Sequence, residues 1–382
     1  MSSVAGAAPA RFPARKRVRV MVVDDSVVVR GLVARWIDAD PDLETVAKCT
    51  NGRAALDSLG PARPDIVVLD IEMPVMDGLT ALPRLLEARP HPHVIIISSR
   101  TRRNAALAVK ALSLGASECL SKPDHEIGAI ASAAFRSELI SRIRGLGGLD
   151  APLGGGAATV RGGAALPAVT GRRPACSAAF DLVPFNRAVP RVLAMASSTG
   201  GPRALATVLS DMGPALANVA TLITQHMPPT FTEMLAVNLS HATGLPAREA
   251  REGESPAPGV IYVAPGDRHL VVRRNGGNIV MSLDDGPPVN FTKPSADVML
   301  QSIAAVYGRA ALAVVLTGMG QDGAAGVTAL RDAGGNVIAQ NEATSVVWGM
   351  PGAAAHTGMC SAVLPLGEIG ACIARVILGG AA

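Results

Sequence analysis

The sequence predicts an α/β protein with two doubly wound parallel-sheet domains joined by a flexible linker. Short apolar, β-branched runs alternate with helical patterns from about residue 18 to residue 145, and this alternation resumes after residue 190. A stretch rich in glycine, alanine and proline lies between the two halves. Continuous apolar strands that alternate with helices are typical of parallel sheets covered on both faces. A length of 382 residues leaves room for two such domains.

The first half opens with a strand at residues 18–23, VRVMVV. Ser26 is expected to cap a helix that runs through Trp36, because its hydroxyl can accept hydrogen bonds from free amides at a helix start. Further strands are predicted at residues 66–69, 94–97 and, from a weaker pattern, 117–120.

The middle of the chain predicts a linker. A Gly/Ala/Pro-rich segment cannot bury enough apolar surface to order itself. The predicted organisation is a basic N-terminal tail at residues 1–17, a first domain at 18–144, the linker at 145–189 and a second domain at 190–382.

The second half repeats the alternation, with strands predicted at residues 192–196, 219–224, 312–316 and 337–340. Between them, residues 259–283 contain two β-rich runs separated by Asn275-Gly276-Gly277, which predicts a β-hairpin.

Composition excludes several classes of protein. Hydrophobic residues make up 49% and charged residues 17%, which is unlike a disordered chain. Five scattered cysteines without a CxxC pair indicate free thiols rather than a disulfide framework or a zinc site. No apolar run approaches the roughly 20 residues of a membrane helix, and the N-terminus is not patterned as a secretory signal. We therefore expect a cytoplasmic protein that does not insert into a membrane. We also expect no nucleic-acid binding, since only 3% of residues are aromatic and the net charge is only +4.

Three carboxylates predict a first functional site. Asp24 and Asp25 follow the first strand, and Asp70 follows the strand at 66–69. Side chains beyond the carboxyl ends of parallel strands converge on one crevice, and grouped carboxylates with oxygen-only chemistry suit Mg²⁺. Lys122 and Ser98 follow other predicted strands and can contact a phosphoryl group formed on a carboxylate. Singly, each acid is equally well explained as a loop residue or a helix cap.

The segments VMVVDDS, VVLDIEMPVMDG, VIIISS and SKP resemble the receiver domain of two-component response regulators. The resemblance covers about residues 18–140 and implies a flavodoxin-like domain that is phosphorylated on Asp70. It further implies that Asp24, Asp25, Asp70 and the backbone carbonyl of Glu72 bind Mg²⁺, and that Ser98 and Lys122 contact the phosphoryl group. Cys119 stands where receivers often carry an aromatic switch residue.

A second candidate site lies in the other half. The turn Ala196-Ser197-Ser198-Thr199-Gly200-Gly201-Pro202 joins a strand to a helix, so a serine there lies among free amides that can stabilise an oxyanion. His226 and Asp322 follow two further strands of the same predicted sheet. Taken one at a time, each feature has another explanation. The turn could bind a phosphate or cap a helix, His226 could be structural, and Asp322 could be a helix N-cap. Together they match a nucleophile, its base and the acid that orients the base.

The segments ASSTGGP, QHMPPTFTEMLA, LTGMGQDGAAG and QNEATSVVWGMP resemble the catalytic domain of the chemotaxis methylesterase (CheB) family, over about residues 190–379. The resemblance implies a Rossmann-like domain in which Ser198 is the nucleophile, His226 the base and Asp322 its orienting partner. Thr199 and the backbone of Met319 would lie beside the oxyanion. Ser197 competes for the nucleophile assignment, and Ser198 keeps the family's register. Phe291-Thr292-Lys293 replaces a segment that is more basic in the family.

The two resemblances imply a phosphorylation-activated protein-glutamate methylesterase that also deamidates glutamines. Its substrate would be a methyl-accepting chemotaxis receptor and its phosphodonor the histidine kinase of the same system. Mg²⁺ would serve the receiver, and the catalytic site would need no cofactor. The unphosphorylated receiver is expected to pack over the catalytic crevice. Two alternatives are a response regulator whose second domain is a non-catalytic binding module and a DNA-binding regulator.

Overall fold

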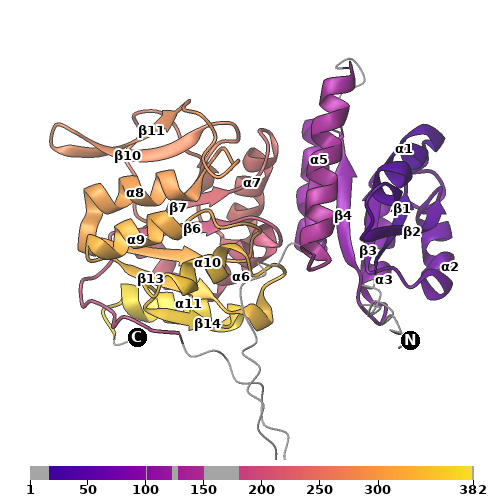
Figure 1. Cartoon of the computed structure of the whole chain (residues 1–382). Coiled ribbons are helices and arrows are strands. Elements are labelled where there is room, and N and C mark those ends of the chain that lie inside the picture. The colour runs from indigo at the N-terminus through magenta and orange to yellow at the C-terminus, as the bar shows by residue number, and fades with distance from the viewer. Residues whose placement is uncertain (1–16, 100, 123–127, 150–179, 381–382) are drawn as a thin grey trace, which may run out of the picture.

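The computed structural model describes residues 17–99, 101–122, 128–149 and 180–380, which form two α/β domains (Figure 1). The basic tail up to residue 16, Cys176 and most of the predicted linker lie outside the described residues. No helix in the described part of the chain is both long and apolar enough to cross a bilayer.

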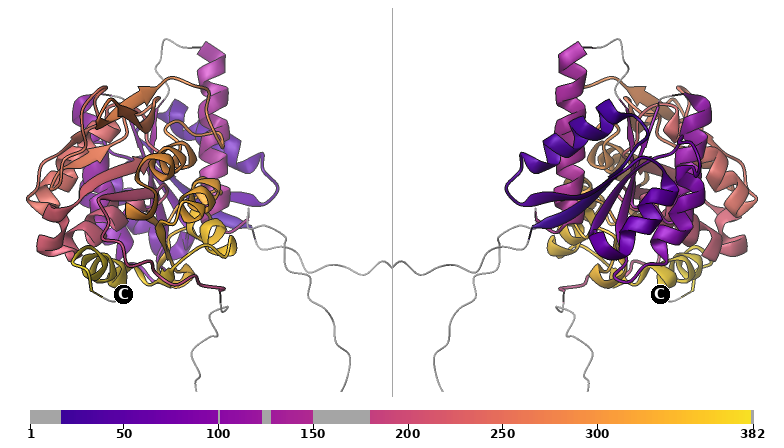
Figure 2. Two further views of the ribbon diagram at one scale, coloured as in Figure 1. Left: turned by 90° about the vertical axis from the view of Figure 1, so that its left-hand side faces the viewer. Right: turned by 90° about the vertical axis from the view of Figure 1, so that its right-hand side faces the viewer.

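The first domain is a five-stranded sheet in which all pairs are parallel, in the order β2-β1-β3-β4-β5. Helices α1 and α5 cover one face, and α2, α3 and α4 cover the other (Figure 2). In chain order, the elements are β1 (Val18–Val23), α1 (Val27–Asp38), β2 (Leu43–Cys49), α2 (Gly52–Ala62), β3 (Ile66–Asp70), α3 (Gly78–Leu86), β4 (His93–Ser98), α4 (Arg102–Leu114), β5 (Glu118–Ser121) and α5 (Gly128–Leu146).

The second domain is a seven-stranded parallel sheet in the order β14-β13-β12-β6-β7-β9-β8, with the antiparallel hairpin β10-β11 beside α8. Helices α6, α7 and α11 cover one face, and α8, α9 and α10 the other. The elements are β6 (Val192–Ser197), α6 (Gly201–Asp211), β7 (Ala220–Gln225), α7 (Phe231–Thr243), β8 (Ala247–Glu249), β9 (Ile261–Val263), β10 (His269–Asn275), β11 (Asn278–Asp284), α8 (Ala296–Tyr307), β12 (Ala311–Val315), α9 (Ala324–Asp332), β13 (Asn336–Gln340), α10 (Met350–His356), β14 (Ala362–Leu364) and α11 (Leu366–Ile377).

The predicted fold class of two parallel-sheet α/β domains is confirmed. Ser26 caps α1, since its hydroxyl accepts a hydrogen bond from the Val29 N–H at 3.4 Å. The hairpin turns at Gly276 and Gly277, with Asn275 paired to Asn278. Strands β2, β8 and β14 had no predicted counterpart, because β2 is a half-buried edge strand and the other two have three residues each.

Residues 180–189, at the end of the predicted linker, pack on the second domain. The Val183 N–H donates to the Cys360 carbonyl (2.9 Å), and the Asn186 N–H donates to the Asn336 side chain (2.8 Å). Phe180 packs against the rings of Trp348 and His356. Aromatic contacts and backbone hydrogen bonds thus order a segment whose composition alone suggested none.

Four cysteines lie within the described residues, and all four are buried and unpaired, namely Cys49, Cys119, Cys360 and Cys372. Cys119, which stands where receivers often carry an aromatic switch residue, is 5% exposed in the core of the first domain. Burial raises the pKa of its thiol well above the ordinary value.

Candidate functional site

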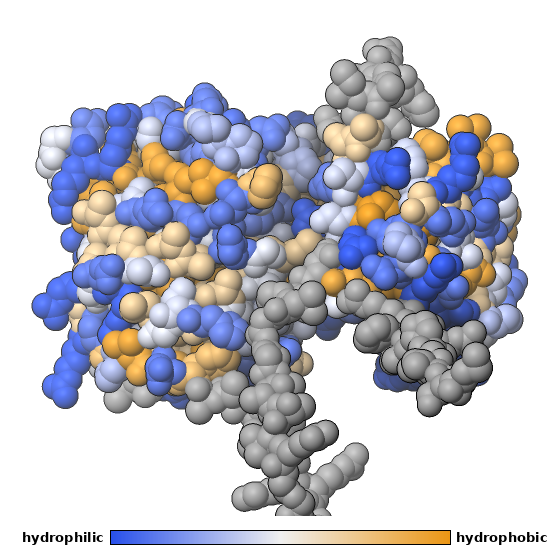
Figure 3. All heavy atoms as spheres, in the orientation of Figure 1, coloured by the Kyte–Doolittle hydropathy of each residue, from blue (hydrophilic) through white to orange (hydrophobic). Residues whose placement is uncertain are grey.

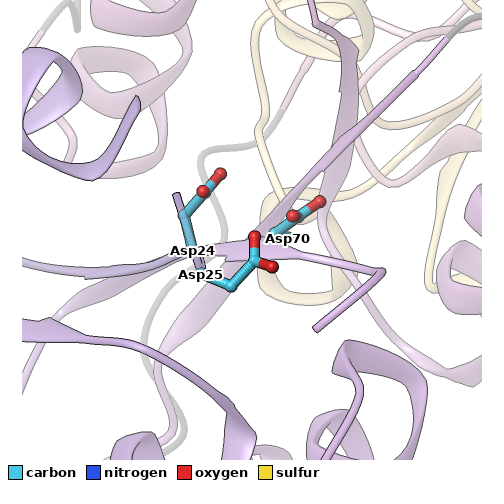
Figure 4. Close-up of side chains that lie close together, drawn as sticks. All are labelled: Asp24, Asp25 and Asp70. Carbon is cyan, nitrogen blue, oxygen red and sulfur yellow. The ribbon is translucent and has the colours of Figure 1, made fainter. Parts of the chain in front are cut away.

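The first site lies at the carboxyl ends of β1 and β3, where the parallel sheet brings Asp24, Asp25 and Asp70 together (Figure 4). One oxygen from each carboxylate lies within 4.8 Å of the others. Asp24 and Asp70 are buried, and Asp25 is exposed. The sequence-based prediction that these three acids converge is therefore realised in the geometry.

Lys122, just beyond β5, balances part of this negative charge. Its Nζ lies 2.8 Å from Asp70 Oδ2 and 3.0 Å from Asp24 Oδ2. Burial raises the pKa of Asp70 to about 6, although Lys122 opposes the shift. A carboxylate that is costly to ionise by itself is one that an added cation stabilises.

The donor set fits a divalent cation. Asp24 Oδ2 is buried, and its contact among the described residues is the ion pair with Lys122 Nζ at 3.0 Å. Three carboxylates that share a single lysine carry excess negative charge, and their oxygens are suited to a hard cation such as Mg²⁺.

Ser98 and Glu72 line the same cavity of about 500 Å³ as Asp70 and Lys122. The Ser98 hydroxyl donates to the Asn104 carbonyl (3.2 Å), and Glu72 Oε2 accepts from the Asn104 side chain (2.9 Å). Asn104 was not predicted as a site residue. It lies at the start of α4 outside any strand-end motif, so the sequence carried no signal for it.

The second site lies at the carboxyl ends of β12, β6 and β7, which are neighbours in the sheet. Ser198 follows β6, His226 follows β7, and Asp322 lies in the loop between β12 and α9. Backbone hydrogen bonds join the loops, since the Ser198 N–H donates to the Thr317 carbonyl (3.0 Å) and the His226 N–H to the Ser197 carbonyl (3.2 Å). The three predicted residues are thereby held at one edge of the sheet.

His226 and Asp322 form a buried pair, with Nε2 of the histidine 2.7 Å from Oδ2 of the aspartate. Asp322 also accepts hydrogen bonds from the Ser295 hydroxyl (2.7 Å) and the Ala296 N–H (2.6 Å) at the start of α8. Burial alone would raise the pKa of Asp322, but His226 and these donors hold it well below its usual range. Asp322 therefore stays ionised and interacts with the N-terminus of α8, whereas Gly323 is the N-cap of α9.

The two candidate serines differ in their surroundings. Ser197 is fully buried, and its hydroxyl donates to Gln225 Oε1 at 2.6 Å. This hydrogen bond already uses the hydroxyl proton of Ser197. Ser198 is 2% exposed, and its hydroxyl has no hydrogen-bond partner among the described side chains. Gly318 packs directly on Ser198, because a Cβ there would lie 2.9 Å from the Ser198 Cβ.

Two backbone donors remain free beside Ser198. Neither the Thr199 N–H nor the Met319 N–H donates to another group in the described part of the chain. Thr199 precedes α6, whose N-cap Gly200 has φ of 76° and is followed by Gly201 and Pro202. Free amides near a helix N-terminus are suited to stabilising a developing oxyanion.

The first domain covers this edge of the second domain. The Thr199 hydroxyl donates to Glu118 Oε2 of β5 at 2.6 Å, and the Gly200 N–H donates to the Ser117 carbonyl at 2.9 Å. Arg142 of α5 lies 3.5 Å from the same Glu118 oxygen. Figure 1 shows α5 facing the second domain, and α4 packs against α6 and α7. Glu118 and Arg142 were not predicted from the sequence as interface residues.

Met319 completes this interface. Its Sδ lies 3.9 Å from the Ser141 hydroxyl of α5, and a Cβ at Gly145 would lie 1.9 Å from its Cε. Met319, which the sequence predicts to lie beside an oxyanion, therefore also contacts the first domain.

Fold and site together define a class of protein, namely a receiver domain joined to an α/β domain with a serine, a histidine and an aspartate at adjacent strand ends. The chain belongs to the protein-glutamate methylesterase/protein-glutamine glutaminase family. The response regulator receiver domain model matches residues 20–131, and the CheB methylesterase model matches residues 193–373. Both resemblances inferred from the sequence are confirmed.

Relatives match nearly the whole chain. A protein-glutamate methylesterase/protein-glutamine glutaminase of Rhodopseudomonas palustris (strain BisB5) is 48% identical over 95% of this chain and 94% of that protein. A group 2 operon protein of the same description from Rhodopseudomonas palustris (strain ATCC BAA-98 / CGA009) is 47% identical over 99% of each chain. The crystal structure of the Thermotoga maritima CheB methylesterase catalytic domain is 36% identical and covers 49% of this chain and 98% of that one, with a TM-score of 0.48.

Proposed function

We propose that the chain is a phosphorylation-activated protein-glutamate methylesterase and protein-glutamine glutaminase that acts on methyl-accepting chemotaxis receptors in the cytoplasm. The observation that carries the proposal is the convergence of Ser198 with the buried His226–Asp322 pair at neighbouring strand ends. If His226 were only structural and Asp322 only a helix cap, the two residues would have no reason to lie at strand ends next to the one that carries Ser198.

In this mechanism, the Ser198 hydroxyl attacks the side-chain carbonyl of an esterified glutamate. His226 Nε2 faces Asp322, which leaves Nδ1 as the ring nitrogen that accepts the serine proton. The free N–H groups of Thr199 and Met319 are proposed to stabilise the oxyanion. Collapse of the intermediate breaks the ester C–O bond, and the proton on His226 leaves with methanol.

Water then hydrolyses the acyl-enzyme by the reverse proton path. His226 takes a proton from the water and returns it to the Ser198 oxygen, and the glutamic acid that is released loses its remaining carboxyl proton to solvent. With a glutamine substrate the same steps release ammonia. Asp322 remains ionised throughout and stabilises the imidazolium.

Mg²⁺ bound by Asp24, Asp25, Asp70 and the Glu72 carbonyl would neutralise the charge of an incoming phosphoryl group. Asp70 would accept the phosphoryl group from the histidine kinase of the chemotaxis system, and Ser98 and Lys122 would contact it. The contacts of Glu118 and Ser117 with the catalytic turn support a receiver that blocks the site until Asp70 is phosphorylated. Both of these residues and Lys122 lie in the single segment 117–122, which provides a short path between the two sites.

Methanol release from a methylated receptor fragment tests the catalytic assignment. Ser198→Ala is expected to lose activity by several orders of magnitude, whereas Ser197→Ala should lose far less, since the Ser197 hydroxyl is hydrogen-bonded to Gln225. A Ser198→Ala variant that still releases methanol would refute the mechanism. Retention of receptor binding by the wild type without any release would favour the alternative of a non-catalytic binding module.

A further inference from the structure

The loop before α8 contains a tight turn of unusual composition. Val289 and Thr292 exchange two backbone hydrogen bonds, of 3.1 and 2.9 Å. The two residues between them both have positive φ, 51° for Asn290 and 63° for Phe291. This pattern normally selects Asn followed by Gly. Asn290 fits its position, but a bulky aromatic residue at the second position is disfavoured by its Cβ.

The turn is anchored to the catalytic acid on both sides of Phe291. The Asn290 side chain donates to Asp322 Oδ1 (3.1 Å) and to Asp297 Oδ2 (2.7 Å). The Thr292 hydroxyl donates to the Val289 carbonyl (2.9 Å) and lies 3.4 Å from Asp322 Oδ2. Bond lengths then place the Phe291 Cα no more than about 11 Å from the Asp322 carboxylate. Phe291 is therefore held at a fixed position relative to the site.

The Phe291 side chain is completely exposed, at 103% of its reference surface. The chain has only ten aromatic residues, of which six are phenylalanine. Single exposed apolar residues are common on proteins, and the face drawn in Figure 3 carries apolar and polar residues side by side. Phe291 differs from an ordinary exposed residue because it adopts a disfavoured backbone conformation and is tied to the catalytic acid. It is also exposed while the receiver covers the catalytic turn, so the domain interface does not account for it.

We infer that Phe291 is a specificity-determining residue, which packs against an apolar side chain of the protein substrate close to the esterified glutamate. This inference rests on the proposed function. A glutamate side chain that reaches Ser198 brings its neighbouring residues across the rim of the site. In a helical substrate each turn advances 5.4 Å, so one or two turns span a distance similar to the limit of about 11 Å between Phe291 and Asp322. A free methyl ester is too small to make this contact.

The test compares Phe291→Ala with Phe291→Leu in the full-length chain with phosphodonor and Mg²⁺. Leu378→Ala, which truncates another exposed apolar residue beyond α11, is the matched control. For a methylated receptor cytoplasmic fragment, Phe291→Ala should lower kcat/KM about tenfold, mainly through KM, because an apolar contact is lost. Phe291→Leu should keep most of the wild-type kcat/KM, and Leu378→Ala should match the wild type. The rate at which a small fluorophosphonate labels Ser198 should be unchanged in all three variants.

An unchanged kcat/KM for Phe291→Ala on the receptor fragment would overturn the inference. An equal fall in fluorophosphonate labelling would also overturn it, since the turn would then merely hold Asp322 in place. If the wild type neither hydrolyses the fragment nor reacts with the fluorophosphonate, the proposed function itself is wrong and the inference falls with it.

Discussion

The contact between Glu118 and the catalytic turn gives a prediction about activity without phosphorylation. The Glu118 side chain is 8% exposed, accepts a hydrogen bond from Thr199 at 2.6 Å and lies 3.5 Å from Arg142. Replacing Glu118 with alanine leaves the Thr199 hydroxyl and Arg142 without this carboxylate in the packed arrangement. When the receiver moves away, both groups can be solvated. The substitution should therefore destabilise the packed state relative to the open one.

The size of the effect follows from the charge on Glu118. A hydrogen bond to a charged group contributes about 1.5–3 kcal/mol net, and each 1.4 kcal/mol changes an equilibrium about tenfold. Glu118→Ala should thus shift the equilibrium toward the open state by about 10- to 100-fold. Methanol release without phosphodonor should rise at least several-fold, and it cannot exceed the rate of the phosphorylated wild type.

The assay measures methanol release from a methylated receptor fragment, with and without a small phosphodonor and Mg²⁺. Glu138→Ala is a matched control, because Glu138 also lies near Arg142 (3.7 Å) but is half exposed. This control should keep the low activity of the unphosphorylated wild type. Unchanged basal activity in Glu118→Ala, with normal activity after phosphorylation, would refute the proposed role of this contact.

Two further predictions concern the catalytic turn and the receiver. In Gly318→Ala, the new Cβ would meet Ser198 at 2.9 Å and Met350 Sδ at 2.5 Å. Methanol release should fall about a hundredfold because the nucleophile is displaced, while Gly277→Ala, at an open position in the hairpin, should match the wild type. In metal-free buffer, burial raises the pKa of Asp70 to about 6, so the folded receiver holds this proton more tightly than the unfolded chain does. The folded receiver should therefore lose stability as the pH rises from about 4 through 6. Asp70→Asn should therefore stabilise the receiver at pH 7 by up to about 3 kcal/mol in urea unfolding and lose this pH dependence; equal stability of the two chains at pH 7 would contradict it.

The sequence predicted the positions of functional residues where they follow buried strands. Asp70, Lys122, Ser198 and His226 each lie just at or beyond the end of an apolar run. Because all parallel strands of a sheet end at the same edge, strand identification alone brought these residues together. Residues 259–283 illustrate the limit, since part of this β-rich segment forms β9 in the main sheet rather than the hairpin. A run of three residues carries too little periodicity to assign its partner.

Contacts between distant segments could not be predicted in the same way. Glu118 looks like an ordinary charged residue in a weak strand, and its importance depends on which face of the receiver meets the second domain. The support of Asp322 by Ser295 and Ala296 depends equally on how α8 packs against the loop after β12. These arrangements are set by tertiary packing, for which local residue patterns hold no signal.

The most direct test of a phosphorylation-controlled serine nucleophile is the rate of Ser198 labelling by a small fluorophosphonate, read by peptide mass spectrometry. The wild type and Asp70→Asn would each be measured with and without phosphodonor and Mg²⁺. We expect an adduct on Ser198 and not on Ser197. It should form faster with phosphodonor in the wild type and at an unchanged basal rate in Asp70→Asn. An adduct on Ser197, or a labelling rate that is the same with and without phosphorylation of Asp70, would contradict a phosphorylation-controlled Ser198 nucleophile.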